Sequence, residues 1–230
     1  MSVVFPPIES ASEEGLLAIG GDLSQETLLS AYSQGIFPWP ISKETPLTWF
    51  SPDPRGVLHL ENFHLPKSFK KFLKKTNMIV KYNTNFEKVL LACAHTPRKN
   101  EQGTWITSEM LRGYNHFFNQ GNAYSVEVYL DDKLVGGLYG VCIGGYVSGE
   151  SMFHTETNAS KVSLHALVTS LKHVGISWID TQMVTPILAS MGAQEITRKL
   201  FIEKLNQVIN KKLGKEKIFA TEFSELNQSE

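Results

Sequence analysis

The chain has 230 residues, a formal net charge of -1 and 42% hydrophobic residues. The composition is typical of a globular protein, and the length allows one large domain or a medium domain with a small companion. It argues against a bilayer-spanning protein, because no apolar run approaches the roughly 18 residues that a membrane helix needs. The N-terminus lacks the basic segment and apolar core of a secretory signal, so we expect a cytoplasmic location.

The two cysteines and seven histidines do not occur at the spacings of metal-ligand sets. The sequence also lacks a P-loop, a G-x-G-x-x-G dinucleotide motif and the G-x-S-x-G motif of serine hydrolases. The spacings therefore argue against a structural metal site.

Proline, glycine and aromatic residues are frequent in the N-terminal quarter of the chain, in stretches such as GIFPWP and WFSPDPR. Among these turns, residues 24–34 predict a short helix that Ser24 caps and Gly35 ends. We expect residues 1–62 to form a small N-terminal α/β lobe and residues 63–230 to form a larger domain.

In the larger domain, the spacing of apolar residues predicts helices and strands in mixed order. Helices are expected over 66–76, 86–94, from Ser108 onward and over 158–174. Strands are expected over 78–82, 123–130, 133–143, 145–153 and 177–182, with hairpin turns at 131–132 and 144–145. This order predicts an α+β fold with a central, mostly antiparallel sheet. It resembles the core of the GNAT-like (acyl-CoA N-acyltransferase-like) fold.

A run of lysines follows the predicted boundary. Six lysines and no acid occur between His64 and Lys81. Those that cover one broad side of the predicted helix are Lys67, Lys70, Lys71, Lys74 and Lys75. Composition supports two interpretations equally, a solvated helix face and a surface that contacts nucleic-acid phosphates.

Two carboxylates and an amide are expected inside the sheet. Asp180 and Gln182 end an apolar strand and, being two residues apart, should lie on the same face. Glu150 is expected within the strand 145–153, where a carboxylate is costly unless it is paired or faces a cavity. The frequent glycines of these strands favour a close approach of another group to the backbone. The alternative is that both acids lie at strand ends in solvent.

Several aromatic residues fall in loops or at helix starts rather than in helical stripes. They are Trp39, Trp49, Phe50, Trp105 and Tyr114. Core packing explains any one of them, whereas together they could line an apolar pocket or stack on nucleic-acid bases.

Nine short motifs link the chain to one family. They are GLLAIGGDLS (15–24), AYSQGIFPW (31–39), WFSPDPR (49–55), TWIT (104–107), SVEVY (125–129), LVGGLYGV (134–141), GESMF (149–153), NASKV (158–162) and IDTQ (179–182). With these motifs in order from about residue 5 to residue 205, the chain resembles the bacterial leucyl/phenylalanyl-tRNA–protein transferases.

The resemblance implies a function. Such proteins move Leu, Phe and, less efficiently, Met from aminoacyl-tRNA to the N-terminal amino group of proteins that begin with Arg or Lys, in the N-end rule degradation pathway. It implies a GNAT-like domain behind a small N-terminal domain, with no metal or coenzyme.

The resemblance also implies site residues. The catalytic pair falls on Asp180 and Gln182, and a further motif glutamate falls on Glu150. The pocket for the donor aminoacyl-adenosine falls on Trp39, Trp105, Tyr114, Leu138 and Val147. The basic cluster that contacts the tRNA backbone in this family corresponds to the lysine run of this chain.

Two residues depart from the family pattern. Ile187 stands where the family usually has a histidine, so any role of that histidine is absent or moved. Val147 stands where a relative can carry Phe, which should widen the donor pocket and alter the ranking of Leu, Phe and Met.

The chemistry of the side chains suggests roles. Because an amide is essentially non-basic, we expect the Gln182 carbonyl to accept a hydrogen bond from the incoming amine. Asp180 should hold the Gln182 amide and stabilise the developing positive charge. Glu150 should bind the cationic end of the acceptor, where a carboxylate suits Arg or Lys.

The sequence leaves two alternative functions open, and it does not determine the oligomeric state. Another GNAT-fold acyltransferase is possible, although the coenzyme A pyrophosphate loop is missing. A non-catalytic module that binds tRNA or N-terminal degradation signals would explain the lysines but not a carboxylate–amide pair on a core strand. Nothing in the sequence demands more than a monomer.

Overall fold

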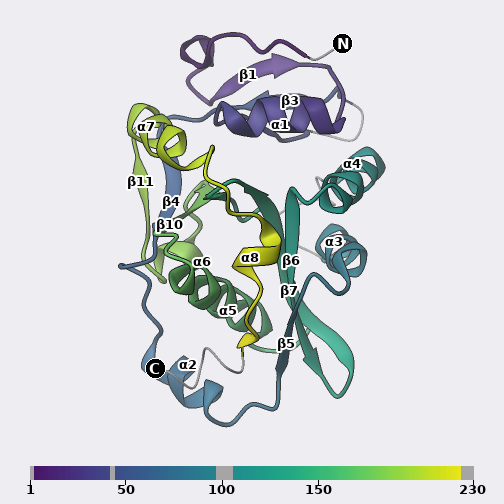
Figure 1. Ribbon diagram of the computed structural model, residues 1–230, viewed down its shortest axis with the longest axis vertical. Helices are drawn as coiled ribbons and strands as arrows, with labels where there is room; N and C mark the ends of the chain where they lie inside the picture. The colour runs from purple at the N-terminus through teal and green to yellow at the C-terminus, as the bar shows by residue number, and fades with distance from the viewer. Residues whose placement is uncertain (1–2, 42–44, 97–105, 224–230) are drawn as a thin grey trace.

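The computed structural model describes residues 3–41, 45–96 and 106–223 (Figure 1). The N-terminal part is a small sheet in the order β1-β3-β2, formed by Leu16–Ile19, Thr48–Phe50 and Phe37–Pro38. Helix α1 (Gln25–Ser33) lies beside this sheet, and a short 3-10 turn, η1 (Ile8–Ser10), precedes it. This is the small α/β lobe that the sequence predicts.

Local polar contacts define both ends of α1. The Ser24 hydroxyl accepts a hydrogen bond from the Thr27 backbone N–H, so Ser24 is the predicted N-cap. Gly35 follows the last turn with a positive φ of 75°, a conformation that glycine adopts without steric cost.

The central sheet runs in the order β5-β6-β7-β8, formed by Ile79–Tyr82, Ala123–Leu130, Lys133–Ile143 and Tyr146–Val147. Strand β9 (Ser151–His154) also pairs with β7, and all these pairings are antiparallel. The β6–β7 turn places Asp131 and Asp132 at positive φ, as a tight hairpin turn requires. The predicted hairpin is therefore confirmed.

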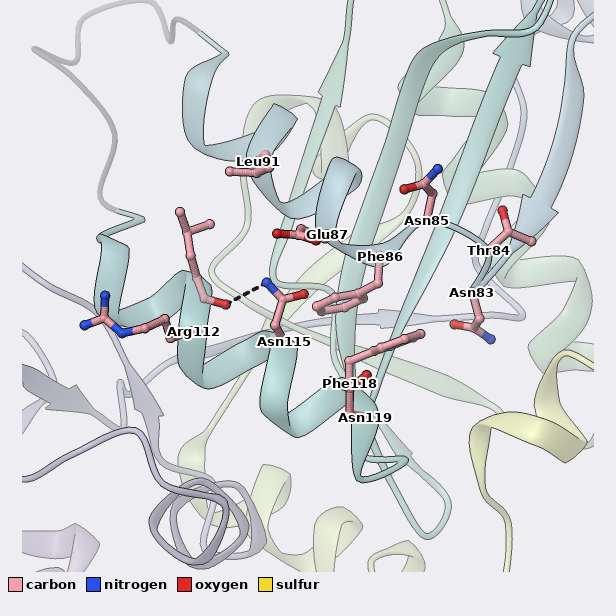
Figure 2. Close-up of a pocket in the computed structure, with 11 residues that line it drawn as sticks. Asn83, Thr84, Asn85, Phe86, Glu87, Leu91, Arg112, Asn115, Phe118 and Asn119 are labelled. Carbon is pink, nitrogen blue, oxygen red and sulfur yellow. Dashed lines mark hydrogen bonds between the residues drawn. The ribbon is translucent and has the colours of Figure 1, made fainter.

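Helices cover both faces of the central sheet (Figure 1). Helix α5 (Ala159–His173) packs on one face, and α3 (Phe86–His95) and α4 (Ser108–Asn119) pack on the other. A Cβ atom at Gly136 would lie 2.5 Å from the Ala159 Cβ, so this glycine permits the close approach of α5. An open groove separates α3 from α4 on the outer side (Figure 2).

A third sheet, β10-β4-β11, consists of Trp178–Gln182, Arg55–His59 and Ala193–Ile196. Because β4 pairs with two strands of the C-terminal half, we propose that the domain boundary lies between β3 and β4 rather than at residue 62. The remaining helices are α2 (Lys67–Leu73), α6 (Pro186–Ala189), α7 (Arg198–Val208) and α8 (Lys215–Ile218).

The molecule is an α+β protein with a central antiparallel sheet, which confirms the predicted fold class. One predicted element is wrong: residues 145–153 do not form a continuous strand, because 148–150 separate β8 from β9. Glu150 therefore lies between strands. Within the described part of the chain, no helix is long and apolar enough to cross a membrane.

Candidate active site

The interruption between β8 and β9 brings two distant segments together. Ser148 forms an isolated parallel bridge with Asp180, and the Gly149 N–H donates to the Asp180 carbonyl at 2.9 Å. Residues 148–150 therefore run alongside the end of β10. The three polar residues that the sequence singled out meet at this junction.

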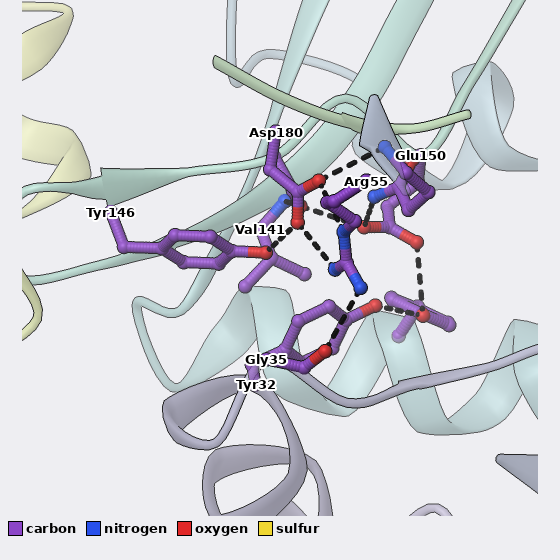
Figure 3. Close-up of polar contacts among 10 residues, drawn as sticks. Tyr32, Gly35, Arg55, Val141, Tyr146, Glu150 and Asp180 are labelled. Carbon is purple, nitrogen blue, oxygen red and sulfur yellow. Dashed lines mark hydrogen bonds and ion pairs between the residues drawn. The ribbon is translucent and has the colours of Figure 1, made fainter. Parts of the chain in front are cut away.

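Asp180 is fully buried, and both oxygens of its carboxylate accept hydrogen bonds from other groups of the protein (Figure 3). Arg55 donates to both oxygens, from Nε to Oδ1 at 2.9 Å and from Nη2 to Oδ2 at 2.7 Å. Oδ2 also accepts from the Tyr146 hydroxyl at 2.6 Å, and Oδ1 accepts from the Gln182 backbone N–H at 2.9 Å. The carboxylate is thus a structural anchor with a permanent countercharge.

Arg55 is the charged residue of this site that the sequence reasoning missed, along with Tyr32, Tyr146 and Ser148. Its side chain is 1% exposed, lies 4.6 Å from the Phe37 ring centroid and 4.3 Å from that of Phe201, and donates from Nη1 to the Gly35 carbonyl at 2.9 Å. The signal in the sequence is an arginine at the start of an otherwise apolar strand. Its partner is 125 residues away, so spacing alone could not identify the pair.

Gln182 follows a bulge in the β10–β4 pairing and has a positive φ of 57°. The bulge and this backbone conformation break the simple side-chain alternation on which the prediction relied. The side-chain Nε2 donates to Glu150 Oε1 at 3.0 Å, while Asp180 contacts the Gln182 backbone. The expectation that Asp180 holds the Gln182 amide is therefore wrong; Glu150 holds it.

Glu150 lies half-buried in a position without a direct cationic partner among the contacts described. Ser148 Oγ donates to its Oε1 at 2.6 Å, and the Tyr114 hydroxyl lies 3.5 Å from its Oε2. Burial, aided by the nearby Asp180 charge, raises the pKa of Glu150 to about 7, although Ser148 and Arg55 act in the opposite direction. This carboxyl can therefore exchange a proton near neutral pH.

Tyr114 connects Glu150 with the N-terminal lobe. Its hydroxyl lies 2.5 Å from that of Tyr32 on α1, and both rings are completely buried. Burial is the main cause that raises the pKa of both phenols well above their ordinary range, so both remain protonated donors at neutral pH.

The predicted donor-pocket residues do not all meet. Tyr114 belongs to the core cluster between the lobe and the α3–α4 side, and half-buried Trp39 packs against that cluster. Leu138 and Val147, which are 2% and 1% exposed, belong to the cluster on the α5 side of the sheet. Trp105 lies outside the described residues.

The five predicted tRNA-contacting lysines are exposed on or just after α2, whose apolar side is anchored by buried Phe69. A cavity of about 580 Å³ lies between α2 and α5 and includes Lys70, Lys74 and Lys172 in its lining. Ile187, at the start of α6, is 39% exposed. In the part of the chain that the structure describes, no group of three or more His, Cys, Asp or Glu side chains is arranged to hold a metal ion.

Comparison with known proteins gives the family. The leucyl/phenylalanyl-tRNA protein transferase family matches residues 57–206, and the N-terminal domain of the same family matches residues 21–53. A leucyl/phenylalanyl-tRNA–protein transferase of Pseudoalteromonas translucida is 48% identical over 213 residues, covering 92% of this chain and 89% of the relative. The protein of the same name from Syntrophotalea carbinolica is 49% identical over 203 residues, covering 88% of each chain.

Among solved structures, a GCN5-related N-acetyltransferase from Kribbella flavida aligns with a TM-score of 0.34 and 11% identity, covering 71% of this chain and 57% of that chain. The two family matches and the extent of the curated relatives decide the assignment. The chain belongs to the leucyl/phenylalanyl-tRNA–protein transferase family, as its motifs predicted, and is an enzyme of the aminoacyltransferase class.

Proposed function

We propose that the protein transfers Leu, Phe and, less efficiently, Met from aminoacyl-tRNA to the α-amino group of proteins that begin with Arg or Lys. This reaction places the protein in the N-end rule pathway. We also propose that it acts as a monomer. The observation that carries this proposal is the Glu150–Gln182 hydrogen bond beside the buried Asp180–Arg55 pair. In a chain of this family, that arrangement suits the handling of an amine nucleophile.

The reaction is the aminolysis of an ester. The acceptor nitrogen forms a bond to the carbonyl carbon, and the tRNA 3′ oxygen leaves with the electron pair of the ester bond. The proton that the nitrogen gives up is passed on to this oxygen, which becomes a free ribose hydroxyl. Because a free α-amino group has a pKa of about 7.7–8.0, most of it is protonated at neutral pH. The site must therefore bind the ammonium group, remove a proton and direct the amine at the ester.

Gln182 orients the amine in this proposal. Its Nε2 donates a hydrogen bond to Glu150, which fixes the orientation of the amide group. The carbonyl oxygen Oε1 is therefore the atom that can accept a hydrogen bond from a substrate. Asp180 acts one step behind, because it holds the Gln182 backbone N–H and thereby the unusual backbone conformation at this residue. Asp180 is thus a positioning residue.

Glu150 accepts the proton in this proposal. Its pKa of about 7 lies near that of an α-amino group, whereas both oxygens of Asp180 are already held by Arg55. In this proposal Glu150 meets the α-ammonium group, which differs from the expected role of binding the Arg or Lys residue of the acceptor.

The lysines of α2 bind tRNA phosphates in this proposal, together with Lys172 of α5, which lines the same cavity. Leu138 and Val147 would form the donor side-chain pocket only after local opening, because both are almost completely buried. The smaller Val147 should favour the larger donor side chain within the modest discrimination that apolar pockets provide.

Transfer of radiolabelled Leu from tRNA to an Arg-initiated peptide tests the proposal directly. Wild-type protein should label peptides that begin with Arg or Lys and leave Ala-initiated peptides unlabelled. Gln182→Ala and Glu150→Gln should each lower kcat by roughly the 10²–10⁴-fold typical of lost acid–base and orienting groups, with little change in Leu-tRNA affinity. Glu156→Gln, at an exposed position, is the matched control. Tight binding of Leu-tRNA without any transfer by wild type would instead indicate a binding module.

A further inference from the structure

The groove between α3 and α4 has no role in the site described above. Its volume is about 580 Å³, and its walls are rich in side-chain amides (Figure 2). The amides come from Asn83, Asn85, Asn115 and Asn119, and a stacked pair of rings, Phe86 and Phe118, lies between the walls. An amide offers both a donor and an acceptor, which suits an uncharged partner that offers both as well.

Several of these amides are available to a ligand. Asn85 occupies the N-cap position of α3 but makes no capping bond with its side chain. The buried Glu127 carboxylate accepts the Thr84 and Asn85 backbone N–H groups instead, each at 3.0 Å. Asn115 uses one amide hydrogen for the Leu111 carbonyl at 2.9 Å, which leaves its carbonyl oxygen, and Asn119 is exposed.

The groove is poorly suited to nucleic acid. Phe86 stacks on Phe118 at 4.3 Å between centroids, and Lys215 Nζ lies 3.5 Å from the Phe118 centroid. Since Phe86 and Lys215 must then cover opposite faces of the ring, no face remains on which a base could stack. The lining contains one acid and one base, Glu87 and Arg112, so it lacks the excess of positive charge that phosphates require.

The spacing of the amides suits a polypeptide backbone. Asn115 and Asn119 are four residues apart on α4, which separates them by about 6 Å along the helix axis. An extended chain repeats every two residues, or about 6.6 Å, with one N–H and one C=O directed to the same side at each repeat. Two amides on one helix face can therefore pair with successive repeats of an extended peptide.

The groove is also close to the candidate active site. Asn115 follows Tyr114 in α4, and the two side chains leave different faces of this helix. The Tyr114 hydroxyl lies 3.5 Å from Glu150 Oε2. We propose that the α3–α4 groove binds the extended backbone of the acceptor polypeptide downstream of its reacting N-terminus. This inference rests on the proposed function, because it takes a protein N-terminus to be the acceptor.

The geometry sets the length of acceptor at which the groove begins to contribute. A helix with its side chains is about 10–12 Å across, and an extended chain covers about 3.3 Å per residue. An acceptor therefore needs about four residues to pass from the site to the groove. Shorter peptides should react without groove contacts.

The test is a series of Arg-initiated peptides of two, four, six, eight and ten residues, in which every side chain after the first is uncharged, each assayed with saturating Leu-tRNA. For wild type, KM should fall by roughly fivefold to thirtyfold once the length exceeds four residues, as expected for one or two net hydrogen bonds, while kcat stays constant. The double variant Asn115→Leu/Asn119→Leu should keep the wild-type KM for the dipeptide and lose the gain for the decapeptide. Asn206→Leu, an exposed asparagine of α7, is the matched control.

A second probe reports on the backbone itself. N-methylation of residues 5 and 7 of the decapeptide should raise its KM for wild type and leave that of the double variant unchanged. A KM that does not depend on length, or a variant that changes the dipeptide KM or the Leu-tRNA affinity, would overturn the inference. Failure of the proposed function gives a different result, namely no transfer to Arg- or Lys-initiated peptides of any length.

Discussion

At the scale of single residues, two neighbouring carboxylates have opposite environments. Asp180 has a bidentate arginine, a tyrosine and a backbone N–H around it. Glu150 has a serine, a glutamine amide and a distant phenol. Because the guanidinium of Arg55 contacts Asp180 directly, Glu150 is the carboxyl that titrates near neutrality, and acid–base sites use this separation of roles.

The first prediction concerns the pH dependence of catalysis. With a pKa of about 7, Glu150 loses its proton as the pH rises through neutrality, so kcat should rise through this range. Glu150→Gln should remove this limb, and any remaining rise should follow the amine. Single-turnover rates between pH 5.5 and 9 measure the difference, and an identical profile for both proteins would exclude Glu150 as the proton acceptor.

The same shift predicts a pH dependence of stability. Because burial raises the pKa from its ordinary value of 4.5 to about 7, the folded protein binds a proton that the unfolded chain has released in this window. The contribution of Glu150 to stability should therefore fall as the pH rises from about 4.5 to 7. Urea unfolding at pH 5 and pH 8 should show a smaller difference in unfolding free energy for Glu150→Gln than for wild type.

The third prediction concerns the buried ion pair. Arg55→Leu leaves the Asp180 charge buried and unpaired, so the unfolding free energy should fall by about 3–5 kcal/mol. The double variant Arg55→Leu/Asp180→Leu removes both charges and should be more stable than either single variant. Equal losses for the single and double variants, measured by urea unfolding, would contradict this account.

At the scale of secondary structure, regular elements were predictable and their interruptions were not. Strands β6 and β7 and helix α5 follow from apolar periodicity and turn residues, because these signals are local. The break at residues 148–150 and the bulge at Gln182 depend on contacts between β10 and a segment some thirty residues away, which no local pattern contains. The site itself is made from these two interruptions.

Glycine illustrates the same limit. Frequent glycines in the strands predicted a close approach of some group to the backbone, and the structure bears this out at Gly136. The approaching group there is helix α5 of the protein itself, through Ala159, rather than a substrate. Residue type indicates that space is needed, whereas the occupant follows from the tertiary fold.

The fourth prediction belongs to helices α2 and α5. Changing Lys70, Lys74 and Lys172 to Ala should lower the affinity for different aminoacyl-tRNAs by similar factors, because phosphate contacts carry no sequence information. The slope of log affinity against log salt concentration should become shallower by about two to three, or somewhat less than one per lost contact. Lys133→Ala, in an exposed position at the start of β7, is the control. An unchanged slope would show that these lysines are simply solvated and do not contact tRNA.

At the scale of the whole molecule, the lobe and the larger domain share one buried junction. The guanidinium of Arg55 contacts Gly35 and Phe37 of the lobe, Phe201 of α7 and Asp180 of β10. The Tyr32–Tyr114 contact crosses the same junction. The sequence indicated two parts of the chain, but their interdependence could not be inferred, because every one of these contacts joins residues far apart in sequence.

The fifth prediction follows from this junction. We expect the two parts to unfold in one cooperative transition, since separating them would expose a buried ion pair. Tryptophan fluorescence and far-ultraviolet circular dichroism should give superimposable urea curves, and calorimetric and van't Hoff enthalpies should agree. Two resolved transitions would show that the lobe is an independent domain.

The way in which the lobe holds Arg55 bears on protein engineering. One contact is the backbone carbonyl of Gly35, a position that requires glycine because its φ is 75° and an added Cβ would lie 2.7 Å from Ile202 Cδ1. The other contact is the ring of Phe37. A chimera that takes its first 53 residues from a relative should therefore remain active if glycine stands at position 35 and an aromatic side chain at position 37. Outside these two positions, the sequence of the lobe could then be exchanged, although the lobe itself is required to hold Arg55.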